Sequence, residues 1–396
     1  MTSRLLLWMA SVAFAGIGMG SNPPEPPEAV LVFTGDIHGY LSPCGCTSPQ
    51  IGGIRRMAGV VRALLKQPHS TYVDIGNWAH PGGRQDELKA EAAATLFYSL
   101  RPAYLNVGQA EATLGASYVR ALNAMTGNRM KSSTLSLEGA IKNSAGIKCG
   151  QLFIEGSLPG GTASDAPQGF ERVLLFAGPR SEAAELADSG LIVYSTSGDP
   201  PRIAAELNGS VLVSPGDRCR YVGRIEFSKG KWQNFSLIQL GPDKVDDPGA
   251  SQIYADYQHR VAAENLLAEL PKTRGPIKFV GSKLCSLCHG RIYRQWEKTA
   301  HALAYRTLQA VGNSRDPECV GCHVVGLVDI TGFASIEKTP RMAAVGCENC
   351  HGPGGQHAKK PYPNYPRIGE DACIICHNSE NSPNFSFAEY WRKIEH

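Results

Sequence analysis

The chain has 396 residues, of which 39 are Lys or Arg and 36 are Asp or Glu, so its formal net charge is +3. This length is enough for two domains. A charge this close to zero excludes the strongly basic character of nucleic-acid-binding domains, so no nucleic-acid partner is expected.

The N-terminus has the pattern of a secretory signal peptide. An apolar stretch over residues 5–14 follows Arg4 and precedes small residues. We expect residues 1–20 to be the signal peptide and residues 21–28 to be a Pro-rich spacer. The alternative is an uncleaved membrane anchor, but the apolar run is short for a span and no Cys follows it for lipid attachment. Because no other segment is apolar enough to cross a bilayer, we expect a periplasmic or extracellular protein without stable membrane insertion.

Strand and helix patterns alternate in the following segment, which we expect to form one domain over residues 29–250. Strands are predicted where short apolar runs occur, and helices where apolar residues recur at helical spacing. Such alternation is typical of an α/β layered domain. The predicted helices cover residues 53–66, 86–100 and 111–125, and the predicted strands cover residues 29–34, 71–75, 104–107, 150–155, 172–176, 191–194, 211–213, 221–227 and 232–239.

Several short motifs of this segment resemble those of one enzyme family. They are Gly35-Asp36-Ile37-His38-Gly39 after the first strand, the Ile-Gly-Gly-Ile-Arg-Arg run of residues 51–56, residues 73–77, residues 106–111, and residues 211–224. The segment resembles the calcineurin-like metallophosphoesterases, in particular the periplasmic 5′-nucleotidase branch. That resemblance implies a β-sandwich flanked by helices.

The metal ligands of that family are largely missing from this sequence. Asn77 stands where the family has its metal-bridging Asp, and Gly108-Gln109-Ala110-Glu111 stands in place of its Gly-Asn-His-Glu motif. No His occurs between His80 and His259, although a two-metal phosphatase needs several imidazoles and a bridging carboxylate. Asp36 and His38 remain as a vestigial metal site. We therefore expect an inactive scaffold or binding module, and a working 5′-nucleotidase or phosphoesterase is the weaker alternative.

Four cysteines lie outside the C-terminal region. Cys149 and Cys219 are expected to form a structural disulfide, as is common in exported proteins. Cys44 and Cys46 have two interpretations that remain open. They can form a structural bond, or they can serve as a redox-active or soft-metal pair, because the ring closed by Cys-x-Cys is strained and strained disulfides are readily reduced.

A helix and a short linker are predicted to join the two halves of the chain over residues 251–276. Residues 251–270 have the pattern of a single helix, which Pro271 ends, and residues 272–276 read as a linker. Beyond this point the apolar fraction falls and Gly, Pro, Cys and His become frequent.

The C-terminal region, residues 277–396, contains four Cys-x-x-Cys-His motifs. This pentapeptide attaches c-type haem, because its two thiols form thioethers with the porphyrin and the adjacent imidazole ligates the iron. We therefore predict four covalently bound haem c groups in a mainly α, haem-cored multihaem cytochrome c domain. The predicted thioether residues are Cys285, Cys288, Cys319, Cys322, Cys347, Cys350, Cys373 and Cys376, and the predicted proximal ligands are His289, His323, His351 and His377.

Ligands for the opposite faces of the four irons are scarce. After residue 275 the sequence contains only three further histidines, His301, His357 and His396, and a single Met, Met342. At most three irons can therefore receive a second imidazole from this region. His396 is the last residue of the chain, and chain ends are usually frayed, whereas the shortage of ligands favours its binding to an iron. Met342 is expected to be a packing residue.

This region resembles the tetrahaem cytochrome c-554 family, the electron acceptors of hydroxylamine oxidoreductase. The matching stretches are residues 281–289, 295–304, 319–326, 345–354 and 373–377. The resemblance implies that His301 and His357 are distal ligands, that haems lie in stacked pairs, and that the second haem has no distal protein ligand. No His precedes Cys373 where the family places another ligand, so the partner of the fourth haem is open, and His396 is the candidate.

These observations favour an exported tetrahaem electron carrier that exchanges electrons with redox proteins and uses the N-terminal domain as a scaffold or docking domain. The alternative is a haem enzyme that reduces a small nitrogen oxide, such as nitric oxide or hydroxylamine, at an open iron. The sequence does not decide between carrier and enzyme, and it gives no oligomeric state.

Overall fold

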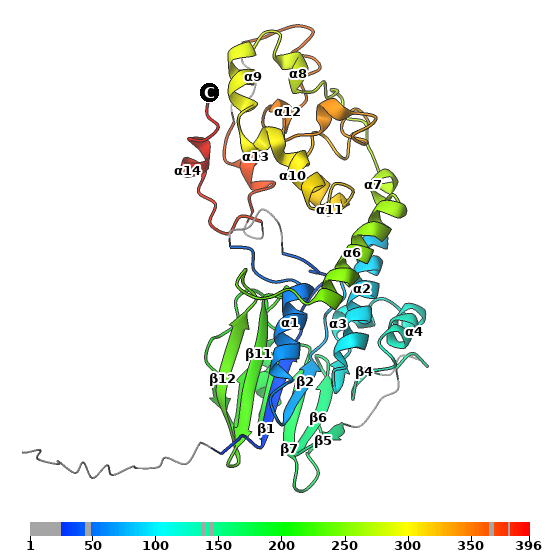
Figure 1. Ribbon diagram of the computed structural model, residues 1–396, viewed down its shortest axis with the longest axis vertical. Helices are drawn as coiled ribbons and strands as arrows, with labels where there is room; N and C mark the ends of the chain where they lie inside the picture. The colour runs from blue at the N-terminus through cyan, green and yellow to red at the C-terminus, as the bar shows by residue number, and fades with distance from the viewer. Residues whose placement is uncertain (1–24, 44–48, 136–138, 142–145, 364–367, 379–380) are drawn as a thin grey trace, which may run out of the picture.

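The structure is a computed structural model, and it describes residues 25–43, 49–135, 139–141, 146–363, 368–378 and 381–396. Two β-sheets with their helices form the N-terminal part, and short helices and turns form the C-terminal part (Figure 1). The predicted signal peptide lies outside the described residues, as does half of the Pro-rich spacer.

The first sheet has six strands in the order β12-β11-β1-β2-β3-β4. The strands β1 to β4 are parallel to one another, and the hairpin of β11 and β12 adds to β1 in antiparallel register. The strands are β1 (Ala29–Thr34), β2 (Ser70–Asp74), β3 (Tyr104–Asn106), β4 (Met130–Lys131), β11 (Tyr221–Ser228) and β12 (Lys231–Gln239).

The second sheet also has six strands, in the order β5-β6-β7-β8-β10-β9. Its four central strands are parallel, and its two outer strands are antiparallel to their neighbours. The strands are β5 (Ile147–Cys149), β6 (Leu152–Ser157), β7 (Glu171–Phe176), β8 (Gly190–Tyr194), β9 (Ala205–Leu207) and β10 (Ser210–Val213).

The two sheets pack face to face over a shared apolar core. Alternate residues of β1 point in opposite directions, so Leu31 and Phe33 enter this core while Val30 and Val32 face the helices. Ile154 and other apolar residues of the second sheet complete the shared core. The expected β-sandwich flanked by helices is confirmed by this arrangement.

Helices cover the outer face of each sheet. In α1 (Ile54–Leu64), Ile54, Met57, Ala58 and Val61 are buried at spacings of three and four residues, which is the pattern that predicted a helix here. The other helices on the first sheet are α2 (Arg84–Leu100), α3 (Gln109–Ala112) and α4 (Ala116–Met125), and α5 (Arg180–Glu185) packs on the second sheet.

Two predicted helices are each divided in the structure. The helix predicted over residues 111–125 is interrupted at Gly115, because its φ of 84° is incompatible with an α-helical backbone. The helix predicted over residues 251–270 becomes α6 (Pro248–Ala263) and α7 (Leu266–Glu269), separated at Asn265, which has a left-handed backbone. Apolar spacing continued across both breaks, so periodicity alone could not detect them.

The C-terminal part consists of short helices and connecting turns around a small apolar cluster that includes Val320, Val325, Phe333 and Met342. Its helices are α8 (Ser282–Cys285), α9 (Gly290–Trp296), η1 (Ala300–Leu303), α10 (Ala304–Ala310), α11 (Pro317–Val320), η2 (Pro340–Met342), α12 (Cys347–His351), α13 (Asp371–Ile374) and α14 (Phe387–Trp391).

A polar seam joins the two parts of the chain. Gln85 on α2 donates to Asp316 with a distance of 2.7 Å, and the Tyr257 hydroxyl on α6 donates to the same carboxylate at 3.3 Å. The largely buried Lys89 of α2 forms an ion pair with Glu318. Asp316 and Glu318 lie within three residues of Cys319, so this seam attaches the second Cys-x-x-Cys-His motif to the sheet domain.

Candidate functional site

Each of the four Cys-x-x-Cys-His motifs lies on or beside a helical turn. Residues three and four apart on a helix share a face, so this conformation directs both thiols and the imidazole of a motif to one side. The backbone confirms the turn in the first and fourth motifs, where His289 N donates to Cys285 O at 2.9 Å and His377 N donates to Cys373 O at 2.8 Å. The third motif coincides with α12.

Three of the four motif histidines face a histidine from elsewhere in the C-terminal part. The ring centroids of His289 and His357 are 6.1 Å apart, and those of His301 and His377 are also 6.1 Å apart. The centroids of His351 and His396 are 5.9 Å apart. Each pair combines one motif histidine with one histidine from outside the motifs.

These separations fit a metal ion between the two rings of each pair. A metal–imidazole bond of about 2.0 Å on each side, plus about 1.1 Å from each ring nitrogen to its ring centre, gives roughly 6.2 Å between centroids. The residues present therefore fit haem iron with an imidazole on each face.

Hydrogen bonds at Nδ1 fix the orientation of two histidine rings, His323 of the second motif and His396 of the pairs above. His323 Nδ1 lies 2.6 Å from Ala304 O, and His396 Nδ1 lies 3.0 Å from Ile394 O. A carbonyl only accepts, so Nδ1 must carry the proton in both rings, which leaves Nε2 as the lone-pair nitrogen. Burial lowers the pKa of His301 and of His377, which favours the neutral, ligating imidazole.

Backbone contacts bring the three non-motif histidines to their positions. His301 O accepts from Val345 N at 3.1 Å, directly before the third motif. The Gly-rich turn before His357 packs on Lys278, because Gly355 N donates to Lys278 O at 3.0 Å and a side chain at Gly355 would collide with that residue. Gln295 Nε2 donates to Glu395 O at 2.6 Å and so fixes the residue before His396.

The structure places His396 beside a different motif from the one for which it was the candidate ligand. The sequence made His396 the candidate for the fourth haem, but its ring faces His351 of the third motif, and the ring of His301 faces His377 of the fourth. The region before Cys373 has no His, and this gap directed the prediction to the fourth motif. Sequence spacing could not reveal that His301, over 70 positions away, lies there instead.

The second motif differs from the other three in its surroundings. Val320, Val324 and Val325, which lie within and after it, belong to the apolar cluster of the C-terminal part. Met342 is fully buried in the same cluster, which is consistent with its predicted packing role.

The first, third and fourth motifs are neighbours. The thiols of Cys285 and Cys347 are in hydrogen-bonding contact, and Cys347 N donates to Ser282 Oγ at 3.1 Å. Between the third motif's cysteines, the buried Glu348 accepts from the backbone of Val280, Gly281 and Gly354. The role of Glu348 could not be predicted from the sequence, because nothing in a Cys-Glu-Asn-Cys spacing indicates that its carboxylate binds backbone amides.

The N-terminal part brings Asp36, Asn77 and Ser195 together at the end of the first strand. Asp36 Oδ1 accepts from Asn77 Nδ2 at 3.0 Å and from Ser195 Oγ at 2.9 Å, and Asp36 Oδ2 accepts from Thr196 N at 3.2 Å. His38 Nε2 lies 3.8 Å from this carboxylate. Within the described residues, no three His, Cys, Asp or Glu side chains are arranged to bind a metal ion.

Burial shifts the pKa values of Asp36 and His38 in opposite directions. It raises the pKa of Asp36 to about 7, although the donors from Asn77, Ser195 and Thr196 lower it, and it lowers the pKa of His38. Glu111, the retained acid of the degenerate motif, is fully buried and accepts from the backbone of Asn77, Ala79 and Gly108. These residues therefore hold the loops together through hydrogen bonds.

The cysteines outside the haem motifs do not follow the predicted pairing. Cys149 and Cys219 are both free thiols, so the expected disulfide is wrong. Cys149 packs between the two sheets, whereas Cys219 belongs to the core beneath the helices, where burial raises its pKa to about 12. Cys44 and Cys46 lie outside the described residues.

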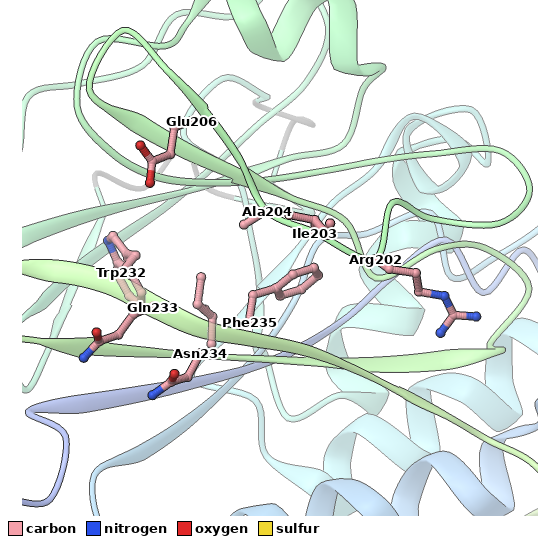
Figure 2. Close-up of a pocket in the computed structure, with 9 residues that line it drawn as sticks. Arg202, Ile203, Ala204, Glu206, Trp232, Gln233, Asn234 and Phe235 are labelled. Carbon is pink, nitrogen blue, oxygen red and sulfur yellow. The ribbon is translucent and has the colours of Figure 1, made fainter.

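A hollow of about 430 Å³ opens where the edge strand β12 approaches the residues leading into β9 (Figure 2). Its lining includes Arg202, Glu206 and Trp232 but no His or Cys. It therefore contains none of the groups that bind haem. In the part of the chain that the structure describes, no helix is long and apolar enough to span a membrane.

Comparison with known proteins gives separate matches for the two parts of the chain. Residues 284–352 match the family described as cytochrome c554 and c-prime. The cytochrome c-554 of Nitrosomonas europaea is 32% identical over 158 residues, covering 31% of this chain and 64% of that protein. This chain thus spans less than two thirds of that relative. These matches support a c-type cytochrome with a haem-based role and covalently bound haem c.

Solved structures similar to the chain belong to another class. The 5′-nucleotidase precursor of Thermus thermophilus has a TM-score of 0.49 at 17% identity, covering 65% of this chain and 62% of that one. The sulfate thiohydrolase SoxB of Thermus thermophilus has a TM-score of 0.48 at 15% identity, covering 64% of this chain and 63% of that one. The two facing sheets described above, not these scores, establish the layered α/β fold.

Proposed function

We propose that this protein is an exported tetrahaem c-type cytochrome that passes electrons between redox proteins. The observation that supports this most is the set of three facing imidazole pairs at separations of 5.9–6.1 Å. Bound haem supplies one-electron redox chemistry, and the chain's own residues provide ligation, spacing and burial. Two imidazoles per iron favour low reduction potentials and electron transfer without substrate binding.

We assign the ligand pairs as His289 with His357, His351 with His396, and His377 with His301. The contact between Cys285 and Cys347 supports close approach of the first and third haems, which short electron-transfer steps require. The signal-peptide pattern supports a periplasmic or extracellular location, where haem attachment to thiols takes place.

A count of haem and spin states tests this proposal. Absorption of the alkaline pyridine derivative should give four haems per chain, and electron paramagnetic resonance of the oxidised protein should give three low-spin centres. Fewer than four haems, or reduced protein that fails to pass electrons to any soluble acceptor, would contradict the proposal.

The distribution of histidines favours a second candidate function, reduction of a small nitrogen oxide. The three non-motif histidines are directed at the first, third and fourth motifs, so the iron of the second motif is a candidate for an exogenous ligand. High-spin haem that binds nitric oxide and turns it over would favour this enzyme, whereas four low-spin centres would exclude it.

The N-terminal domain, residues 29–250, is proposed as a scaffold that supports the second haem motif through the polar seam. Its former metal-binding edge is closed by hydrogen bonds from Asn77, Ser195 and Thr196 to Asp36. A 5′-nucleotidase activity is therefore not supported. Metal-dependent release of phosphate from nucleoside monophosphates by the purified protein would overturn this assignment.

A further inference from the structure

Positive charge is concentrated around the first haem motif. Residues 272–298 contain seven Lys or Arg and a single acid, Glu297, so this segment has a formal charge of +6. The whole chain has a charge of +3, and the rest of the chain therefore has a charge of −3. A near-neutral total thus conceals a strongly basic region.

Six cations on this surface are exposed and form no ion pair with a described carboxylate. We define the basic face as Lys278, Lys283, Arg291, Arg294, Lys298 and Arg341, all of which are exposed. Arg341 is not in the basic segment itself, but it packs beside Gly281 at the start of α8.

Cations elsewhere in the described chain commonly pair with acids, as Arg55 and Arg260 do with Asp246 and Glu91. None of the six cations of the basic face forms an ion pair with a described residue. Lys283 instead lies 5.4 Å above the ring of Tyr293, whose hydroxyl is bonded to Glu297. The charge of the basic face is therefore available to an external partner.

The first haem motif is exposed in the middle of these cations. Leu287 is 78% exposed and Leu284 is 41% exposed. A shallow hollow of about 390 Å³ beside the motif is lined by Leu284, Lys278 and Arg341 among others. Apolar side chains ringed by unpaired cations form a surface suited to brief, charge-steered docking.

We propose that the basic face is the docking surface for an acidic redox protein and that electrons cross at the first haem. This inference rests on the proposed electron-transfer function and adds to it a place of exchange and a kind of partner. The six cations exceed the two propionates of one haem, so the face remains positive when haem is bound. Complementary charge raises association rates by about 10–1000-fold, and salt removes most of that gain.

Small charged probes test the field of the basic face. Ferricyanide, an anion, takes one electron from ferrous haem and becomes ferrocyanide, and its second-order rate can be followed by stopped flow. At about 10 mM ionic strength, where the screening length is about 30 Å, the triple variant Arg291→Gln, Arg294→Gln, Lys298→Gln should react about tenfold more slowly. A matched variant, Lys66→Gln, Lys229→Gln, Lys231→Gln, removes the same charge from exposed positions of the N-terminal part and should react at the normal rate.

An acidic protein tests docking itself. A reduced plant-type [2Fe–2S] ferredoxin donates one electron to ferric haem, and this rate should fall strongly with the triple variant, return with the charge-retaining variant Arg291→Lys, Arg294→Lys, and converge for all proteins at high salt. Haem content and absorption spectra of each variant establish that it is folded.

Two outcomes would overturn the inference while leaving the proposed function intact. Equal rates for the triple variant and the matched control would place docking elsewhere. Binding to phosphatidylglycerol vesicles that the triple variant abolishes, with unchanged ferredoxin kinetics, would assign the basic face to a membrane. If ferredoxin reduced none of the haems, the proposed electron-transfer function would fail instead.

Discussion

Single histidines determine which haem receives which ligand. The hydrogen bonds from Nδ1 of His323 and of His396 to backbone carbonyls each set the tautomer of the ring. The motif histidines could be assigned from sequence because the pentapeptide contains both sulfurs and the imidazole. Their partners could not be assigned, since they come from chain segments that only the tertiary fold brings together.

The pairing of His396 with His351 can be tested by substitution. His396→Ala should convert one low-spin haem into a high-spin haem, because one iron loses an axial imidazole, and the absorption and resonance spectra report this change. His69→Ala, an exposed histidine of the N-terminal part, should have no effect.

The same substitution should have no further effect in a protein that lacks the third haem. In a background with Cys347→Ala and Cys350→Ala, the number of low-spin haems should be the same with or without His396. A further loss of low-spin haem in that background would mean that His396 ligates another iron.

Buried acids at strand ends give the N-terminal sheet an unusual response to pH. Asp74 ends β2 and accepts from Thr34 Oγ1 at 2.5 Å and from Gly76 N at 2.9 Å. Burial is the main cause that raises its pKa from 3.8 to about 7; the hydrogen bonds from Thr34 and Gly76 lower the pKa, and the nearby Glu111 and Asp36 contribute to the rise. Folding therefore favours the protonated carboxyl, and this contribution to stability is lost as pH rises from about 4 to about 7.

The free energy of unfolding should accordingly fall by about 1.4 kcal/mol per pH unit for each such group across this window. Asp74→Asn should flatten this slope and make the protein more stable than the parent at pH 8, as measured by urea unfolding at pH 5 and pH 8. Asp243→Asn, at an exposed position, is the control. An unchanged slope in the Asp74 variant would contradict the buried-proton explanation.

The helix α11 connects the second haem motif with the sheet domain. Asp316 caps this helix by accepting from Glu318 N at 3.0 Å, and it also accepts from Gln85 and Tyr257 across the seam. Asp316→Ala should destabilise the protein by roughly 1–3 kcal/mol, because it removes a helix cap and leaves buried donors unsatisfied.

Loss of the seam should also expose the connection between the two parts. We expect faster proteolysis near residues 264–276 in Asp316→Ala than in the parent, detected by mass spectrometry of the fragments. Asp243→Ala, which removes an acid from an exposed ion pair with Lys244, provides the comparison. Equal cleavage in both variants would show that the seam does not restrain the connection.

At the scale of the whole molecule, the two halves should respond differently to loss of haem. Replacing all eight motif cysteines by Ala should leave the twelve-stranded N-terminal part folded, because its cores contain no haem residue. The C-terminal part should lose its helical structure, as small domains organised by a bound group do. Circular dichroism and protease resistance measure both effects, and a helical, protease-resistant C-terminal part would contradict this expectation.

The sequence predicted the strong periodic elements and missed the weak ones. The central strands and α1 and α2 were found within a few residues, because buried strands and amphipathic helices repeat over many positions. The short outer strands β4, β5 and β9 were missed, since two or three residues contain too little pattern. The seam and the basic face were also missed, because both depend on which surfaces meet or remain exposed.

The relative tilt of the paired imidazoles has a spectroscopic consequence. The ring planes of His289 and His357 are 21° apart, whereas those of His351 and His396 are 61° apart. Parallel axial ligands split the iron d orbitals strongly and crossed ligands split them weakly, so these ferric centres should differ in magnetic anisotropy. Each electron that enters the chain could then be located by the resonance line it removes.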